Sequence, residues 1–223
     1  MCGIIGAFFK DGIDEPVMKQ ATDVLAHRGP DAAGYYTDAT QHVFLGHRRL
    51  SIIDVSSASN QPLFSQDERY VIVFNGEIYN FEQLRQKLPA HQWKTTGDTE
   101  VIIELFVRFG TESFQWLNGI FAFSIYDIQE RKIYLCRDQL GVKPLFIQRD
   151  KDKLIFASEL KAICAVSKEQ GGSAFMVSRK AVAHFLHLGY IPEPMTIYRG
   201  IKKFPAGNYA CFDLTSGEWS RTK

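Results

Sequence analysis

Short runs of apolar or alternating residues recur along the chain and predict strands. Turn residues separate neighbouring runs by too few positions for a helical crossover, so most strand pairs should be antiparallel. The predicted strands are Ile4–Phe9, Val43–Leu45, Tyr70–Phe74, Phe121–Asp127, Ile133–Cys136, Leu145–Gln148, Leu154–Ala157 and Asn208–Asp213.

In other segments the spacing of apolar residues lengthens to that of an amphipathic helix. The predicted helices are Val17–Ala26, Phe81–Leu88, Thr99–Phe109, Glu159–Val166 and Arg179–Leu188. Asp98 or Thr99 should cap the third helix with its side-chain oxygen. Together the two patterns predict an α+β fold in which helices cover sheets.

The composition changes after Val166, where Ser167–Ser173 is polar and rich in glycine and predicts a flexible loop. We expect a single domain over residues 1–223, with its core at residues 1–166 and a C-terminal extension at 167–223. Glu218–Lys223 has the pattern of neither a capping helix nor a closing strand. We therefore expect this chain to be part of a longer protein.

Composition and charge narrow the class of protein. The 223 residues can bury a full core, and 45% hydrophobic with 23% charged residues is usual for a soluble globular protein. Lys and Arg total 26 against 25 acidic residues, without any basic block. This balance argues against nucleic acid or a membrane surface as the main partner. The sequence lacks a membrane-length apolar run and a signal peptide, so we expect a cytoplasmic location.

Cysteine is the second residue of the chain. Removal of Met1 would place a free α-amine and a thiol on one residue, and their pKa values are about 8 and about 8.5. The amine could then accept the thiol proton, through one water, without a histidine partner. The alternative is that Cys2 is a small core residue at the start of a strand. The other cysteines are scattered, so neither a disulfide framework nor a metal site is predicted.

Four polar motifs accompany this cysteine, and each has a simple structural explanation on its own. Asn75-Gly76 is typical of a hairpin turn, Arg49 of an ion-pair partner and Asp98 of a helix cap. The motifs are His27-Arg28-Gly29-Pro30-Asp31, His47-Arg48-Arg49-Leu50-Ser51-Ile52-Ile53-Asp54, Asn75-Gly76-Glu77-Ile78-Tyr79-Asn80 and Thr96-Gly97-Asp98-Thr99-Glu100.

Taken together, the motifs suit attack of a thiolate on the carboxamide of an amino acid. The side-chain amide of Asn75 and the backbone N–H of Gly76 could hold the tetrahedral oxyanion. Glycine at this position would leave the approach of the substrate open. Arg49 offers a planar fork for the α-carboxylate, and Asp98 with Glu77 offers oxygens for the α-ammonium.

The order of these motifs resembles that of the class II glutamine amidotransferases, which are N-terminal nucleophile hydrolases, and within them the glutaminase half of asparagine synthetases. The resemblance implies a four-layer α-β-β-α sandwich of two antiparallel sheets. It is carried by Cys-Gly-Ile at 2–4, the four motifs above, Asn-Gly-Ile-Phe-Ala-Phe at 118–123, the segment from Arg137 to Leu145 and Ala-Ser-Glu-Leu-Lys at 157–161.

The resemblance also implies roles for individual residues. Cys2 would be the nucleophile, with Asn75 and Gly76 as the oxyanion hole. Asp31, Arg137 and Asp138 are expected to be structural, because buried charged residues are usually paired. The substrate-binding residues would be Arg49, Glu77 and Asp98, the backbone of Leu50, Ile52 and Ile53, and Arg28 and Gly29 beside the nucleophile.

The implied activity is hydrolysis of glutamine to glutamate and ammonia. The ammonia would serve an ATP-dependent asparagine synthetase-type domain, in cis or in trans. We expect no cofactor in this domain, since the loop that binds pyrophosphate is absent from the sequence and ATP and magnesium belong to the synthetase domain.

Three alternatives remain open or are disfavoured. One is a free-standing glutaminase subunit, and another is a catalytically silent amino-acid-binding or docking module with a structural Cys2. A general cysteine peptidase is disfavoured, since no motif places a histidine with Asn or Asp. The sequence leaves the ammonia acceptor open, and also whether the chain forms a homodimer.

Overall fold

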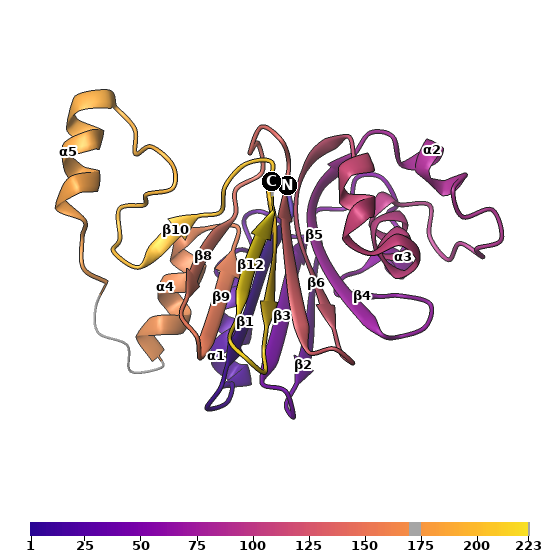
Figure 1. The fold of residues 1–223 in the computed structure, drawn as a ribbon, viewed down its shortest axis with the longest axis horizontal. Coiled ribbons are helices and arrows are strands. Elements are labelled where there is room, and N and C mark those ends of the chain that lie inside the picture. Colours follow the sequence, from indigo (N-terminus) through magenta and orange to yellow (C-terminus); the bar gives the residue numbers. More distant parts are fainter. Residues whose placement is uncertain (170–174, 223) are drawn as a thin grey trace.

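The computed structural model describes residues 1–169 and 175–222, which form four layers. Two six-stranded antiparallel sheets pack face to face, and helices cover their outer faces (Figure 1). The predicted α+β fold and its four-layer arrangement are thereby confirmed. The expected loop at Ser167–Ser173 was wrong at residues 167–169, which form the end of a helix, and its residues 170–173 lie outside the described residues.

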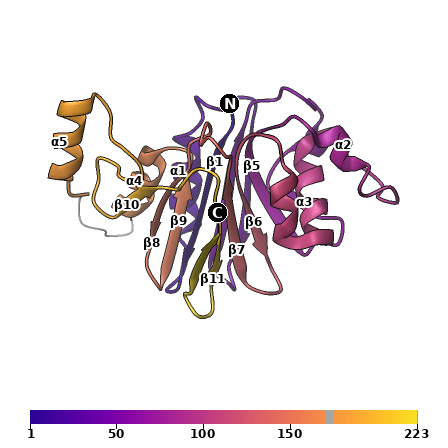
Figure 2. The same ribbon diagram turned by 45° about the horizontal axis from the view of Figure 1, so that its top comes forward.

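The first sheet carries the N-terminal strand near its centre. Helices α1 (Glu15–Asp23) and α4 (Leu160–Glu169) cover its outer face (Figure 2). Its strands, in spatial order, are β10 (Ile201–Lys203), β8 (Phe146–Arg149), β9 (Lys153–Ala157), β1 (Gly3–Phe9), β3 (Val43–Arg49) and β2 (Ala32–Asp38).

The second sheet is covered by α2 (Phe81–Arg85), α3 (Asp98–Phe109) and the 3-10 helix Gly110–Trp116. Helix α5 (Arg179–Leu188) stands apart from both sheets (Figure 1). The strands, in order, are β12 (Trp219–Thr222), β11 (Tyr209–Asp213), β7 (Lys132–Arg137), β6 (Gly119–Asp127), β5 (Tyr70–Ile78) and β4 (Leu63–Phe64).

Strand β1 is buried on both faces, which explains its unbroken apolar run. Ile4 and Phe8 point between the sheets, whereas Ile5 and Ala7 point to the layer under α1 and α4. Burial of one large apolar side chain contributes roughly 1.5–3 kcal/mol. Packing on both faces therefore fixes the position of β1 within the first sheet. It also fixes the position of Cys2, which directly precedes the strand.

Two expectations about local structure were wrong, and one alternative explanation is excluded. Asn75 and Gly76, which on their own are typical of a hairpin turn, form no turn, because β5 runs through them to Ile78 and pairs with β6. Gly97, not Asp98 or Thr99, is the N-cap of α3, and the Asp98 side chain bonds elsewhere. Glu218–Lys223 contains a strand after all, since Trp219–Thr222 pairs with β11.

Strands β2, β4 and β10 were also missing from the prediction. Strand β2 is a half-exposed edge strand with the sequence AAGYYTD, and β4 and β10 are only two and three residues long. Such short or edge strands bury too little apolar surface to leave a clear pattern. Within the described ranges, no helix is long and apolar enough to cross a membrane.

Candidate active site

A cavity of about 120 Å³ opens where the N-terminal end of β1 faces the C-terminal end of β5. Figure 2 shows the N-terminus at this edge, between β1 and β5. The wall contains nine residues that the sequence analysis singled out, Cys2, Arg49, Leu50, Ile52, Ile53, Asn75, Gly76, Glu77 and Asp98. These nine residues, which lie up to 96 positions apart in the chain, are thus brought into one wall.

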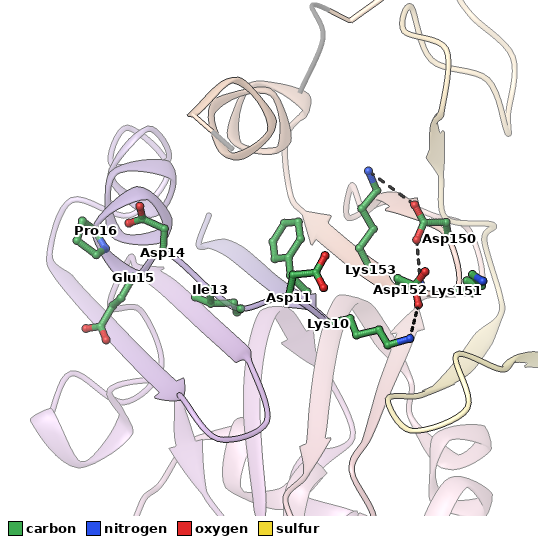
Figure 3. A pocket seen from close by; sticks show the side chains of 12 residues that line it. Lys10, Asp11, Ile13, Asp14, Glu15, Pro16, Asp150, Lys151, Asp152 and Lys153 are labelled. Atoms are coloured by element: carbon green, nitrogen blue, oxygen red, sulfur yellow. Dashed lines mark hydrogen bonds and ion pairs between the residues drawn. The ribbon is translucent and has the colours of Figure 1, made fainter. Parts of the chain in front are cut away.

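A much larger hollow of about 1140 Å³ lies at the other end of β1. Figure 3 shows its wall, formed by residues 9–16 and the turn at 150–153. Four of its charged groups form two ion pairs, with 3.1 Å between Lys10 Nζ and Asp152 Oδ1 and 3.7 Å between Lys153 Nζ and Asp150 Oδ2. Since no nucleophile lines it, the smaller cavity is the better candidate for an active site.

The thiol of Cys2 lies against the backbone of Leu50. The N–H of Leu50 donates to Sγ at 3.4 Å, and Sγ lies 3.7 Å from the carbonyl oxygen of Leu50. Burial raises the pKa of the Cys2 thiol, although the Leu50 N–H, the N-terminal charge and Arg49 oppose this rise. The thiol is therefore protonated near neutral pH and needs a base before it can attack.

Arg28 holds the backbone of the nucleophile from behind. Its Nε donates to the carbonyl oxygen of Cys2 at 2.8 Å, and its Nη1 pairs with Glu159 at 3.0 Å. A side chain on Gly29 would overlap the backbone of Arg48. Arg28 and Gly29 therefore lie behind Cys2, outside the wall of the cavity, where they set the position of the nucleophile.

Asn75 extends the inner face of β5 into the cavity. Val71 and Val73 on this face belong to the core between the sheets. Asn75 follows them with 1% of its surface exposed, and neither its Oδ1 nor its Nδ2 has a hydrogen-bond partner among the described residues. An unsatisfied buried amide costs about 1–3 kcal/mol, so both ends of this side chain are free to bond a molecule that enters the cavity.

The backbone of Gly76 faces the same edge. The N–H of Phe74 donates to Gln61 Oε1 at 2.6 Å, and that of Ile78 donates to Asp98 Oδ2 at 2.9 Å. Alternate residues of a strand turn their N–H groups to the same side, so the N–H of Gly76, midway between these two, points to this edge.

Gly76 is required for a reason other than the one expected. A Cβ at this position would overlap the carbonyl oxygen of Ile120 and crowd Phe121 on β6. The glycine thus permits close approach of two strands, and it does not act by clearing the path of a substrate.

Arg49 is held by oxygens and forms no ion pair among the described residues. Its Nη1 donates to Ser56 O and Asn60 Oδ1, both at 2.7 Å, and its Nη2 donates to Asp54 O. Three of its five N–H donors are thereby used, and two remain for a carboxylate.

Asp54 joins this arginine to the loop before α3. Its Oδ2 accepts bonds from the N–H and the hydroxyl of Thr96 at 2.8 and 3.0 Å, and its Oδ1 accepts from the N–H of Ser56. Hydrogen bonding by the side chain of Ser56, followed by the N–H groups of Thr96 and Ser56, holds the pKa of Asp54 well below its usual range. Asp54 is therefore a fixed anionic link between the loops that carry Arg49 and Asp98.

Asp98 is a buried carboxylate in the wall. Burial raises its pKa to about 6, and the charge of Glu77 adds to this effect, against hydrogen bonds from backbone N–H groups that include that of Ile78. A cation that enters the cavity would stabilise the charged form of this carboxylate, which burial has deprived of hydration.

His47 does not serve as a base in this cavity. It is fully buried, and burial lowers its pKa to about 3, so the imidazole is neutral. Its Nε2 lies 3.1 Å from the carbonyl oxygen of Phe74. His47 thus joins β3 to β5 beneath the cavity and fixes the distance between the two sheets.

The expected structural charges have structural contacts. Asp31 accepts the N–H of Ser51 at 2.8 Å, and Arg137 pairs with Glu193 at 2.8 Å. Asp138 accepts four backbone N–H groups, those of Phe121, Leu140, Val142 and Lys143.

Several residues of the wall were missed by sequence reasoning, namely Asp54, Ser59, Gln61, Phe74, Gly97, Thr99 and Lys143. Asp54, Gly97, Thr99 and Lys143 occur in motifs already quoted, so only their position in the wall was missing. Gln61 has no such signal, because only the tertiary fold places it between the N–H of Phe74 and the hydroxyl of Thr99.

The chain is similar to known proteins over almost its whole length. Residues 1–221 match a protein family described as a glutamine amidotransferase domain. The glutamine-hydrolyzing asparagine synthetase 1 of Bacillus subtilis is 37% identical over 215 residues, which cover 93% of this chain and 33% of that protein. The glutamine-hydrolyzing asparagine synthetase 3 of the same organism is 36% identical over 211 residues, with 91% and 33% covered.

A solved structure shows the same fold. The glutamine phosphoribosylpyrophosphate amidotransferase from B. subtilis matches with a TM-score of 0.71 and 20% identity, covering 100% of this chain and 49% of that chain. This chain spans about a third of the length of the two asparagine synthetases.

Proposed function

This chain belongs to the class II glutamine amidotransferase family, in the group related to asparagine synthetases, and on this premise we propose that it hydrolyses glutamine to glutamate and ammonia. The observation that carries the proposal is the buried, unpartnered amide of Asn75, which lines the same cavity as the thiol of Cys2. A hydrolase of amides needs such a donor beside its nucleophile.

The first half-reaction begins with removal of Met1. The α-amine of Cys2 then accepts the thiol proton, and the thiolate attacks the side-chain carboxamide carbon of glutamine. Asn75 Nδ2 and the N–H of Gly76 stabilise the oxyanion of the tetrahedral intermediate. The ammonium of Cys2 returns its proton to the leaving nitrogen, so that the C–N bond breaks, ammonia leaves and a thioester forms.

The second half-reaction consumes one water. The α-amine of Cys2 takes a proton from this water, and the hydroxide attacks the thioester carbon in the same oxyanion hole. The C–S bond breaks, glutamate leaves and the proton returns to the sulfur. One glutamine and one water thus give one glutamate and one ammonia.

Two groups hold the ends of glutamine that do not react. The two remaining N–H donors of Arg49 bind the α-carboxylate. Asp98, with Glu77 nearby, binds the α-ammonium, and the backbone of Leu50, Ile52 and Ile53 closes the wall around the side chain. Lys143, in the same wall, adds a further positive charge beside the cavity.

The ammonia is proposed to serve an asparagine synthetase-type acceptor domain that uses ATP, because the relatives are named as glutamine-hydrolyzing asparagine synthetases and are about three times as long. After removal of Met1, we expect residues 2–223 with glutamine, aspartate, ATP and magnesium to give glutamate and ammonia in equal amounts, without asparagine or AMP. Separation of the products by chromatography measures this. AMP formed in proportion to an amidated product would contradict the proposal that ATP-dependent amidation takes place in another domain. Unreacted glutamine would contradict the proposed hydrolysis.

Glutamine binding should weaken in acid because of Asp98. Its pKa of about 6 means that the carboxylate is charged above this pH and neutral below it, so the attraction to the ammonium disappears as the pH falls. In a Cys2→Ala protein, which binds without turnover, we expect Kd to rise by up to roughly tenfold per pH unit below pH 6. Calorimetric titration of glutamine measures it.

The matched control for this titration is Asp98→Asn in the same Cys2→Ala background. Its binding should be weak at every pH, without the inflection near pH 6. An inflection of the same size in both proteins would assign the titration to another group.

A further inference from the structure

A third, separate pocket lies at the open edge between the two sheets. Its volume is about 270 Å³, and it is lined by Ile147, Arg149, Pro194, Gly200, Lys202, Lys203, Pro205, Trp219 and Arg221. Four of these residues are cationic, and no carboxylate is among the described residues of the wall. None of its residues lines the cavity of Cys2.

Strand pairing shows why three of these cations face one another. Lys202 pairs with Ile147, and Arg149 follows Ile147 by two residues on β8. On the other sheet Arg221 pairs with Ala210. Ile147 and Ala210 belong to the core between the sheets, so the three cationic side chains continue the inner faces beyond the end of this core. Strands β10 and β12 are the edge strands of their sheets (Figure 1).

The positive charges at this edge are not neutralised by described side chains. Arg149, Lys202 and Arg221 form no ion pair with a carboxylate within residues 1–169 and 175–222. Burial together with the charge of Arg221 lowers the pKa of Arg149, so the two guanidinium groups repel one another. Arg149 also lies over the ring of Trp219, 4.6 Å from its centroid.

We propose that this pocket binds a small phosphate-bearing anion. Cationic groups from β8, β10 and β12 surround it on several sides, which suits a tetrahedral phosphate better than a flat carboxylate that one guanidinium fork would satisfy. The remaining wall of Pro194, Pro205 and Trp219 leaves room for the organic part of a phosphate ester. Lys203 is already engaged, because its Nζ donates to Ile191 O at 2.7 Å.

The competing explanation is that these side chains only cover the apolar edge of the core, with their charged ends in water. The two explanations differ in how the protein responds to an anion. A specific site binds phosphate in a saturable way, and the bound anion reduces the repulsion between the guanidinium groups of Arg149 and Arg221. A cover of solvated side chains responds only to ionic strength.

The experiment titrates residues 1–223 with inorganic phosphate slightly above neutral pH, at constant ionic strength set with chloride. We expect saturable NMR shifts at the indole N–H of Trp219, with the indoles of Trp93 and Trp116 unchanged. Phosphate should also raise the Tm by roughly 2–4 °C over the chloride reference. Arg149→Gln and Arg221→Gln should each weaken phosphate binding at least roughly tenfold.

Lys151→Gln is the matched control, because it removes one positive charge from the adjacent turn but not from this pocket. It should bind phosphate like the parent protein. Arg221→Gln should in addition have a higher Tm than the parent in chloride alone, since the repulsion with Arg149 is gone. Three outcomes would each overturn the proposal, namely absence of saturation, equal weakening by Lys151→Gln, or succinate binding as tightly as phosphate.

Discussion

Glutamine hydrolysis should be lost completely when the chain keeps an extension before Cys2. The thiol is buried and protonated near neutral pH, and the only group proposed as its base is the α-amine that removal of Met1 creates. An amide at this position cannot accept a proton. Met1 also lines the cavity itself, so a retained residue would occupy part of the space intended for glutamine.

The comparison requires two preparations of one protein. The first carries an N-terminal tag with a protease site directly before Cys2, and the second is the same sample after cleavage. Mass spectrometry establishes each N-terminus, and glutamate release measures activity. Cys2→Ala after cleavage should be equally inactive but should still bind glutamine. Full turnover before cleavage would eliminate the α-amine as the base.

Replacement of Asn75 by alanine should lower kcat by roughly 10² to 10³ with little change in KM. The side-chain amide has no hydrogen-bond partner among the described residues, so the proposed bond to the oxyanion would form as the tetrahedral intermediate develops. Removal of a partner that binds mainly this intermediate affects the chemical step more than substrate binding. Steady-state kinetics with glutamine measure both constants.

Arg49→Ala supplies the opposite pattern, with a raised KM, because the α-carboxylate is bound equally in the substrate and the intermediate. Arg48→Ala is the control for charge, since Arg48 bonds Gly29 O and Asp23 away from the cavity. A large KM effect of Asn75→Ala, with kcat preserved, would move Asn75 from the oxyanion hole to substrate recognition.

How much of the fold could be predicted from the sequence follows from how each strand is buried. Strand β1 is buried on both faces and was visible as a continuous apolar run, whereas β2 is an edge strand whose residues are half-exposed. Strand β12 was missed because Trp219 is its only large apolar residue, and that residue packs against the core from the edge. The pattern of apolar residues reveals a strand only where its side chains are buried, and these two edge strands bury few side chains.

The candidate site shows the same division. Cys2, Arg49 and Asn75 were identified because each lies in a sequence motif with unusual chemistry. In the structure Cys2 directly precedes β1, Arg49 ends β3 and Asn75 lies inside β5. The reason for Gly76 was misjudged, since the crowding by Ile120 arises from pairing with a strand more than 40 residues away. Gln61 could not be found at all, because its role depends on Phe74 and Thr99, which only the folded chain brings beside it.

The link through Asp54 has an evolutionary consequence. Asp54 joins the loop after Arg49 to the segment that leads into α3, so the groups proposed to bind the two ends of the substrate belong to one connected unit. A substitution that shifts either loop carries the other with it, and its effect depends on what already stands at the partner position. Such epistasis would restrict the stepwise evolution of a preference for substrates of another length, because the surroundings of Arg49 and Asp98 would have to change together.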